Sequence, residues 1–295
     1  MTGGSSVDRH GAGVRRPFGG PLRGARADMV RARMARSIAR SAPRFSERSL
    51  LPPPILIIGC GRSGTTLVAG LVGSHSHVAM FPGEANELWH PGLYPWHRAD
   101  VDVPPFWLDE NRFLALSNPS PLIPSVLGAF CLLSKHRRIL TKSVMVCGIL
   151  NRVVSMLPGV RIVEVVRNGL DVSRSYARKE RAKIERYAGR YARWNITNTE
   201  RELEALLLRH WARQVSSVDE ARISGLEVLR VVYEELLVDP VHIVRGILNY
   251  VGLDDEGVDG GLLKQVRRGP RPPVLDSAPA IDPSSREVLC RLGYL

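Results

Sequence analysis

Cysteine is scarce in this sequence of 295 residues, and the four that are present lie far apart. They form no C-x-x-C pair, and no H-E-x-x-H motif occurs, so the sequence predicts neither a disulfide framework nor a zinc site. It also contains no run of 18 apolar residues, which predicts no transmembrane helix. The first residues lack the apolar stretch of a secretory signal, so a cytoplasmic location is the default expectation.

Lysine is absent from residues 1–50, although the whole chain carries a net charge of +12. This segment holds eleven arginines and three acids, so two-thirds of the excess charge belongs to it. Its Gly/Ser/Arg-rich composition predicts a disordered head (1–50), followed by one folded domain (51–295). Residues 27–42 could form a short basic helix in weak contact with an anionic membrane surface, a partner or nucleic acid. A solvated tail is the favoured interpretation, and nucleic acid is not expected to be the main partner.

The stretch ILIIGCGRSGTTLVAGL (55–71) is typical of a strand, a glycine-rich turn and the start of a helix. Prolines precede the apolar run 55–58, which predicts a short buried strand. The glycines allow backbone N–H groups to crowd around an anion, and the helix N-terminus adds about half a positive charge. The sequence therefore predicts an anion-binding turn. A strand-to-helix turn that binds nothing is the less favoured alternative.

The nucleotide P-loop pattern G-x-x-x-x-G-K-[ST] fits this turn, except that Thr65 stands where the lysine is expected. No Gly-Lys pair occurs anywhere in the chain, and the nearest cation is Arg62 inside the turn. Because the P-loop lysine reaches the β- and γ-phosphates, its absence weakens a kinase or NTPase interpretation. The turn is expected to bind an anion smaller than a triphosphate tail.

Apolar runs alternate with helical patterns along the rest of the chain. This alternation predicts an α/β fold, a P-loop-like parallel sheet with helices on both faces. Strands are expected at 55–58, 77–82, 138–143, 161–166 and 226–233, and helices at 125–134, 145–157, 170–194, 200–218, 239–252 and 284–292. Trp211 belongs to an apolar stripe on the helix at 200–218, so it is expected in the core.

Residues 91–124 differ in character from the rest, because prolines and aromatic residues are frequent there. The aromatic residues are Tyr94, Trp96, Phe106, Trp107 and Phe113, with Trp89 at the edge of the segment. Two interpretations remain open. The segment is an irregular lid or wall that faces a substrate, or it is a surface insertion packed down by its aromatic side chains.

Four segments together carry a resemblance to a known family: GCGRSGTTL (59–67), TKS (141–143), VEVVRNGLDVSRS (163–175) and VVYEELLVDPVHIVRGILNYVGL (231–253). They are similar, in the same order, to motifs of the sulfotransferases that use 3′-phosphoadenosine 5′-phosphosulfate (PAPS). The likeness is to the branch with an R-S-G-T-T loop, which includes tyrosylprotein and many bacterial enzymes. It implies transfer of a sulfuryl group from PAPS to a hydroxyl group of a small-molecule, glycan or glycolipid acceptor, without a metal ion.

The resemblance also implies roles for individual residues. Arg62, as the cation of the turn, and Lys142 would stabilise the transferred group and the leaving oxygen. Arg167 and Ser175 would bind the 3′-phosphate, and Tyr233 would contact the adenine. The 5′-phosphate and sulfonate would be bound by the turn, whose members are Gly61, Arg62, Ser63, Gly64, Thr65 and Thr66.

The general base that takes the proton of the acceptor is assigned to Glu84, which follows a strand end as the glutamate base does in the similar branch. His90 is the second choice and Glu87 the third. Arg268 and Gly269 match a further part of the 3′-phosphate site only weakly. Two other functions remain open, a P-loop kinase-like phosphotransferase and a non-catalytic nucleotide-binding module.

Overall fold

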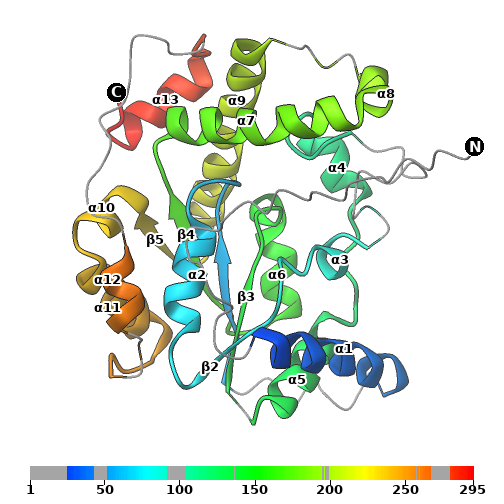
Figure 1. Ribbon diagram of the computed structural model, residues 1–295, viewed down its shortest axis with the longest axis vertical. Helices are drawn as coiled ribbons and strands as arrows, with labels where there is room; N and C mark the ends of the chain where they lie inside the picture. The colour runs from blue at the N-terminus through cyan, green and yellow to red at the C-terminus, as the bar shows by residue number, and fades with distance from the viewer. Residues whose placement is uncertain are drawn as a thin grey trace, which may run out of the picture.

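The computed structural model contains one parallel β-sheet with the strand order β2-β3-β1-β4-β5 (Figure 1). It describes residues 25–42, 52–91, 93, 104–135, 137–194, 196, 199–256, 258, 260–266 and 280–295. The strands are β1 (Ile55–Ile58), β2 (Val78–Met80), β3 (Arg138–Lys142), β4 (Arg161–Val166) and β5 (Val228–Val232). All neighbouring pairs are parallel, so every strand ends at the same edge of the sheet. The predicted fold class is confirmed.

The central strand β1 is buried on both sides of the sheet. Its four residues are all 0% exposed. Ile55 and Ile57 pack into one apolar layer, and Leu56 and Ile58 pack into the other. An uninterrupted apolar run of this kind is typical of a parallel strand that is covered on both faces.

One face of the sheet is covered by helices from the first third and the last quarter of the chain (Figure 1). Apolar side chains of these helices join the layer that contains Ile55 and Ile57. The helices are α2 (Thr65–Gly73), α10 (Tyr233–Val238), α11 (Pro240–Val251) and α12 (Gly260–Gln265).

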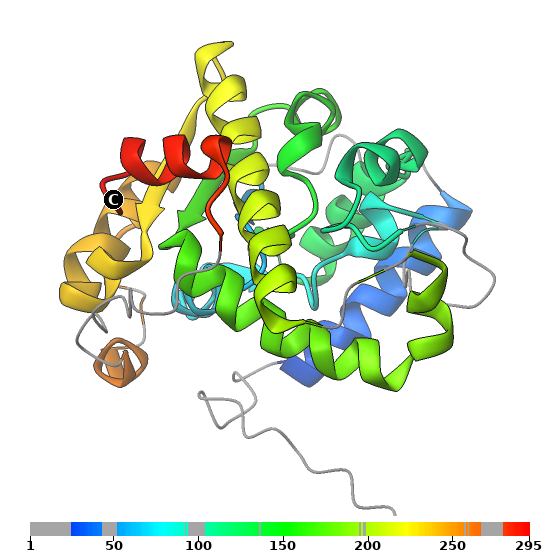
Figure 2. The ribbon, with the colours of Figure 1, turned by 90° about the horizontal axis from the view of Figure 1, so that it is seen from above.

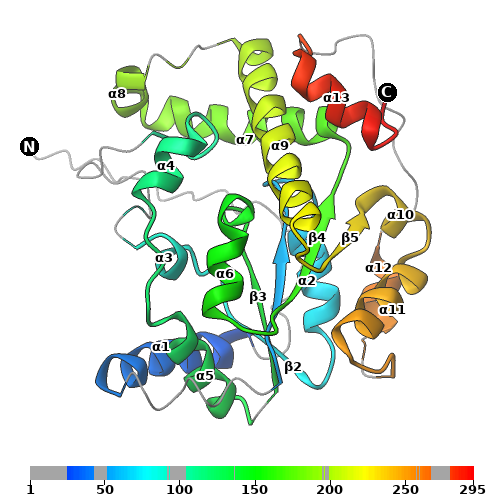
Figure 3. The same cartoon turned by 180° about the vertical axis from the view of Figure 1, so that it is seen from behind.

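The opposite face is covered by helices that Figure 3 shows in front of the sheet, together with α1 beyond them. They bury the layer that contains Leu56 and Ile58. These elements are α1 (Ala25–Ser41), α5 (Ile123–Leu133), the 3₁₀ turn η3 (Cys147–Ile149), α6 (Leu150–Met156) and the long α9 (Glu200–Ile223).

Beyond the carboxyl edge of the sheet lies a group of helices, seen from above in Figure 2. Trp211 of α9 is 0% exposed, and its indole ring occupies the place that a side chain at Gly169 would need. The expectation that Trp211 is a core residue is confirmed. The group contains α4 (Glu110–Leu116), α7 (Gly169–Arg186), α8 (Ala188–Tyr191), η4 (Ala192–Trp194) and α13 (Pro283–Arg291), whereas α3 (Asn86–Trp89) packs Leu88 and Trp89 into the layer of Leu56 and Ile58.

Within the segment that composition assigns to the head, α1 (Ala25–Ser41) corresponds to the basic helix that the sequence allowed at 27–42. Ala32, Ala35 and Ala39 lie on one side of α1, are 0% exposed and belong to the same apolar layer as α5. The helix is therefore part of the folded body, although residues 1–24 and 43–50 lie outside the described residues.

The described aromatic residues of the segment 91–124 are packed down. Phe106, Trp107 and Phe113 are at most 4% exposed, and the neighbouring Trp89 is 1% exposed. Trp107 Nε1 also donates a hydrogen bond of 3.1 Å to Glu180 Oε2. These four side chains fit a packed insertion rather than an open wall, and Tyr94 and Trp96 lie outside the described residues. None of the helices in the described part of the chain is long and apolar enough to span a membrane.

Candidate functional site

The carboxyl ends of all five strands carry residues that the sequence singled out. The glycine-rich turn follows β1, Glu84 follows β2, Lys142 ends β3, Arg167 follows β4 and Tyr233 follows β5. Open parallel sheets bind their ligands at this edge. The strand order places Glu84 and Lys142 on one side of the turn, and Arg167 and Tyr233 on the other.

Two positions of the turn require glycine. Gly59 has a φ of 141° and Gly64 has a φ of 100°, both in the left-handed region that side chains disfavour. A Cβ atom at Gly59 would overlap the carbonyl oxygen of Val165, and one at Gly64 would overlap the ring of Tyr233. The turn therefore lies directly against the ends of β4 and β5, and α2 begins immediately after Gly64.

The start of α2 offers donors for an anion. The first backbone N–H groups of a helix have no partner within the helix, and they carry its positive dipole end. Ser63 is 1% exposed, and its Oγ forms no hydrogen bond with a described residue. Thr65 is buried with its methyl carbon toward Gly59, whereas Thr66 is exposed. These donors fit a phosphate or sulfonate group, with Thr66 as the threonine that faces outward.

Arg62, the cation of the turn, is directed toward α7. Its Nε donates a hydrogen bond of 3.0 Å to Ser175 Oγ. Its φ of 79° is uncommon for a residue with a side chain, and such conformations persist where the surrounding structure enforces them, often at functional sites. The structure thus joins a residue of the turn to a residue 113 positions later in the chain.

Arg167 lies just before α7, the helix that contains Ser175, and packs against the ring of Tyr233. Its guanidinium carbon is 5.0 Å from the centre of the Tyr233 ring, and its Nη2 is 3.2 Å from Asp171 Oδ2. The side chain of Arg167 is 26% exposed, so its remaining donors are accessible from solvent. Asn168 begins α7 by accepting a hydrogen bond from the backbone N–H of Leu170, which fixes the position of Arg167 before the helix.

Glu84 and Lys142 form an ion pair on the far side of the turn. Lys142 Nζ is 2.6 Å from Glu84 Oε1, and Asn86 Nδ2 donates to Glu84 Oε2 at 3.0 Å. Ser143 extends this network by donating to Asn86 Oδ1 at 3.3 Å. Burial acts to raise the pKa of Glu84, but the charge and hydrogen bond of Lys142, with smaller contributions from Asn86 and Lys179, bring the pKa below its ordinary value. Glu84 is therefore ionised at neutral pH and able to accept a proton.

A sequence profile described as the sulfotransferase family matches residues 53–257, which include every one of these site residues. The chain belongs to the sulfotransferase family. No curated protein sequence matches the chain significantly.

Solved structures support the same fold for this sulfotransferase at low sequence identity. The sulfotransferase domain of the Synechococcus PCC 7002 olefin synthase aligns with a TM-score of 0.55 and 17% identity, over 82% of this chain and 95% of that one. The sulfotransferase STF9 from Mycobacterium avium aligns with a TM-score of 0.57 and 13% identity, over 91% of this chain and 82% of that one. A sulfotransferase domain from the curacin biosynthetic pathway aligns with a TM-score of 0.52 and 14% identity, over 83% of this chain and 99% of that one.

The two other candidate bases of this sulfotransferase occupy less suitable positions. His90 is 0% exposed, its Nδ1 lies 2.5 Å from Ser117 Oγ, and burial lowers its pKa to about 4. Glu87 forms an ion pair with Arg36 of α1, away from Lys142. The structure therefore favours Glu84 among the three, because it alone contacts the lysine of the site. Arg268 and Gly269 lie outside the described residues.

Sequence reasoning missed Lys179, which lies one helical turn after Ser175 on α7. The side chain is largely exposed, yet nearby protein atoms and the positive charges of Lys183 and Arg62 lower its pKa, while Glu180 and Glu84 act to raise it. The ammonium group of Lys179 therefore interacts electrostatically with both Arg62 and Glu84. The i, i+4 spacing from Ser175 was the available signal, since it places both side chains on one face of the helix.

A second missed group is a buried polar cluster of Glu110, His210 and Gln214. All three are at most 4% exposed, and His210 Nδ1 is 3.4 Å from Glu110 Oε2. Gln214 Nε2 donates to Glu110 Oε1, but neither His210 nitrogen makes a hydrogen bond with a described residue. The ring of Tyr176 lies between His210 and Gly61 of the turn, in edge contact with the imidazole. The only sign of this cluster in the sequence was the i, i+4 spacing of His210 and Gln214 on α9.

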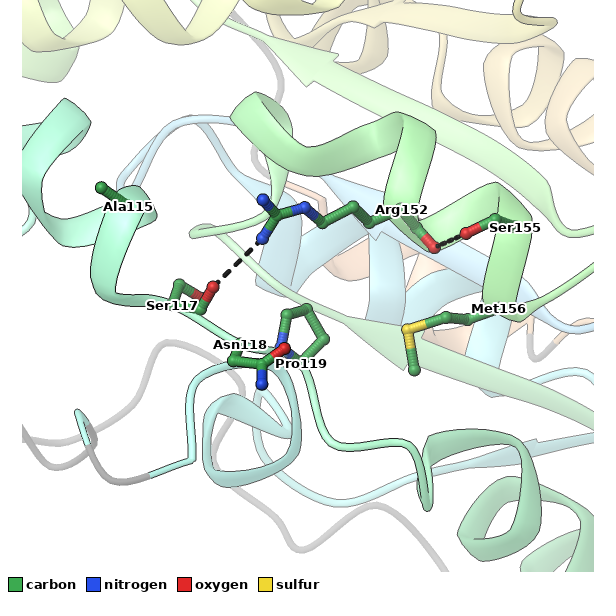
Figure 4. A pocket seen from close by; sticks show the side chains of 7 residues that line it. All are labelled: Ala115, Ser117, Asn118, Pro119, Arg152, Ser155 and Met156. Carbon is green, nitrogen blue, oxygen red and sulfur yellow. Dashed lines mark hydrogen bonds between the residues drawn. The ribbon is translucent and has the colours of Figure 1, made fainter.

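A pocket of about 420 Å³ lies between the end of α4 and α6 (Figure 4). Arg152 Nη1 donates to the carbonyl oxygen of Ser117 at 3.1 Å across it. Its lining contains none of the candidate site residues: Ala115, Ser117, Asn118, Pro119, Arg152, Ser155 and Met156.

Proposed function

We propose that this sulfotransferase transfers the sulfuryl group of PAPS to a hydroxyl group of a small-molecule, glycan or glycolipid acceptor and releases 3′-phosphoadenosine 5′-phosphate (PAP). The observation that carries the proposal is the hydrogen bond between Arg62 and Ser175. It joins the cation of the anion-binding turn to the helix beside Arg167. Cationic side chains on both the turn and the start of α7 suit a nucleotide with phosphate groups on both its 5′ and 3′ positions.

The residues present fit such a donor. Ser63 Oγ has no hydrogen-bond partner among the described residues, and the N-terminus of α2 adds its positive dipole end, which suits the 5′-phosphosulfate. Arg167 offers a planar pair of donors for the 3′-phosphate, and Ser175 offers a hydroxyl group. Tyr233, which packs on Arg167 and against Gly64, provides an aromatic surface for the adenine.

Lys142 and Glu84 divide the chemistry of transfer between them. Sulfuryl transfer, like phosphoryl transfer, depends on positioning and on stabilising the charge that builds on the leaving oxygen. Lys142 supplies that positive charge, with Arg62. Glu84 accepts the proton of the acceptor hydroxyl group.

The ion pair also couples the two roles. Lys142 holds the pKa of Glu84 low, whereas burial acts to raise it. When Lys142 donates to the leaving oxygen, its influence on Glu84 weakens, and burial raises the affinity of the carboxylate for a proton. Proton acceptance by Glu84 is therefore favoured at the step where Lys142 is needed elsewhere.

Transfer from sulfur-labelled PAPS to a panel of hydroxyl compounds and extract fractions tests the proposal. Glu84→Gln is expected to leave PAP binding unchanged and to slow turnover by roughly 10² to 10⁴-fold, the usual contribution of a general base. Glu87→Gln, which removes a carboxylate three residues away, is the matched control and is expected to keep turnover. Near-normal turnover in Glu84→Gln would remove Glu84 from this role, and no transfer to any acceptor would contradict the proposal itself.

A further inference from the structure

One side of α1 packs against the body of the protein, and the other side is exposed. The inner side carries the buried alanines Ala32, Ala35 and Ala39, which belong to the apolar layer of α5. Arg36 strengthens this attachment, because its guanidinium carbon is 5.3 Å from the centre of the Phe81 ring and it pairs with Glu87. The helix is therefore held at a fixed orientation on the body.

The outer side of α1 carries a row of exposed apolar side chains. Val30 is 58% exposed, Met34 48% and Ile38 36%, and their i, i+4, i+8 spacing aligns them along the helix. Met29 adds a further apolar side chain that is 51% exposed. Isolated exposed apolar residues are ordinary, but a row of them on one helix indicates an interaction surface.

A row of arginines runs beside the apolar row. Arg26, Arg33 and Arg40 are spaced by seven residues, so they share one side of the helix, and all three are exposed. None of them forms an ion pair with a residue that the structure describes. The only acid of α1, Asp28, is already paired with Arg31 at 2.6 Å. The outer side thus combines positive charge with apolar surface and no unpaired acid of its own.

We propose that the outer side of α1, comprising the apolar row and the arginine row, docks on the surface of an anionic lipid bilayer. A bilayer interface offers phosphate groups to the arginines and acyl chains to Val30, Met34 and Ile38 at the same time. Nucleic acid would satisfy only the arginines, because its backbone has no apolar partner for the second row. The eight positive charges in excess within residues 1–50 favour the same surface.

The position of α1 is compatible with catalysis by the docked protein. Figure 1 shows α1 near the end of the sheet where the strands begin, whereas the candidate site lies at the carboxyl edge. Docking through α1 therefore leaves the turn after β1 accessible from solvent. The inference does not depend on the identity of the donor or of the acceptor.

Sedimentation of the full chain with vesicles tests the inference. We expect binding to vesicles of phosphatidylcholine with one-quarter phosphatidylglycerol, and little binding to phosphatidylcholine alone. Val30→Asp combined with Met34→Asp is expected to weaken binding at least about tenfold, since it places charges in the apolar row. Replacing Arg26, Arg33 and Arg40 with Gln is expected to weaken it roughly 100-fold, at about fivefold per arginine.

The matched control is Val238→Asp combined with Val241→Asp, which changes the net charge equally at exposed apolar residues of α10 and α11. It is expected to bind as the unaltered chain does. Thermal melting verifies folding, and Val30→Gln combined with Met34→Gln replaces the aspartate pair if that pair does not fold. Equal binding to both vesicle types, or equal losses in the α1 pair and the control pair, would overturn the inference. Preferential binding to RNA over anionic vesicles would overturn it as well.

Discussion

Arg167→Ala is expected to weaken the binding of PAP far more than the binding of AMP, which lacks the 3′-phosphate. A hydrogen bond to a charged group contributes about 1.5 to 3 kcal/mol. The pair with Asp171 that binding replaces is partly exposed, with both side chains more than a quarter exposed, so it contributes at most about 1 kcal/mol. Arg167 can make two such bonds to one phosphate, about 3 to 6 kcal/mol together, so a net loss of about 2 to 5 kcal/mol remains, or roughly 30 to 4,000-fold in Kd.

Calorimetric titration of both nucleotides against the unaltered chain and Arg167→Ala measures this difference. The affinity for AMP is expected to change by less than about threefold, because AMP has no group for Arg167 to bind. Arg178→Ala, which removes an exposed arginine from the same helix, is the control and is expected to leave both affinities unchanged. Equal losses for PAP and AMP in Arg167→Ala would refute the assignment of the 3′-phosphate to this side of the turn.

Three further predictions concern the turn, the ion pair and acid stability. Gly64→Ala is expected to lower PAP affinity and to destabilise the fold by about 1 to 3 kcal/mol in urea unfolding, because of its left-handed φ. The control is Gly70→Ala within α2, where the added Cβ meets no atom within 4 Å, so the change is expected to be neutral or stabilising. Lys142→Met removes the charge that lowers the pKa of Glu84, while burial still raises it, so the acidic limb of the pH–rate profile is expected to move to higher pH. An unchanged acidic limb would show that Lys142 does not control the pKa of Glu84. His90 has its pKa lowered to about 4 by burial, so stability is expected to fall by about 3 kcal/mol as pH decreases from about 6.5 to 4; urea unfolding of His90→Asn should lack this step.

The strands were predictable because simple local signals bound them. Prolines precede β1 and glycine follows it, and β4 lies between Gly159 and the Arg-Asn-Gly segment, so both strands match their predicted ranges. β2 was expected at 77–82 but spans Val78–Met80, since only these three residues pair with β3. Apolar residues continue beyond β2, and the sequence alone does not show where pairing stops.

The packing of α1 was not predictable from composition, for a different physical reason. Composition averages over a segment, and the arginines of residues 1–50 dominate that average. Packing depends on one side of a helix only, and three alanines at positions 32, 35 and 39 are sufficient for close contact with α5. The alanine spacing was the signal that distinguished a packed helix from a solvated tail.

The candidate site was predictable to the extent that its residues follow strand ends. Glu84 and Arg167 do so, Lys142 is itself the last residue of β3, and parallel topology brings strand ends together. Lys179 and His210 lie within helices instead. Their proximity to the turn depends on how α7 and α9 pack over the sheet edge, which spacing along the chain does not determine.

Calorimetric titration of PAP in the presence of EDTA, followed by competition with ATP and Mg²⁺, tests whether the turn binds a PAPS-type nucleotide. We expect PAP to bind without a divalent ion and ATP not to displace it, because the turn has Thr65 in place of the P-loop lysine and Arg62 directed toward Ser175. Binding of ATP with Mg²⁺ more tightly than PAP would contradict PAPS-dependent transfer and favour a kinase-like phosphotransferase.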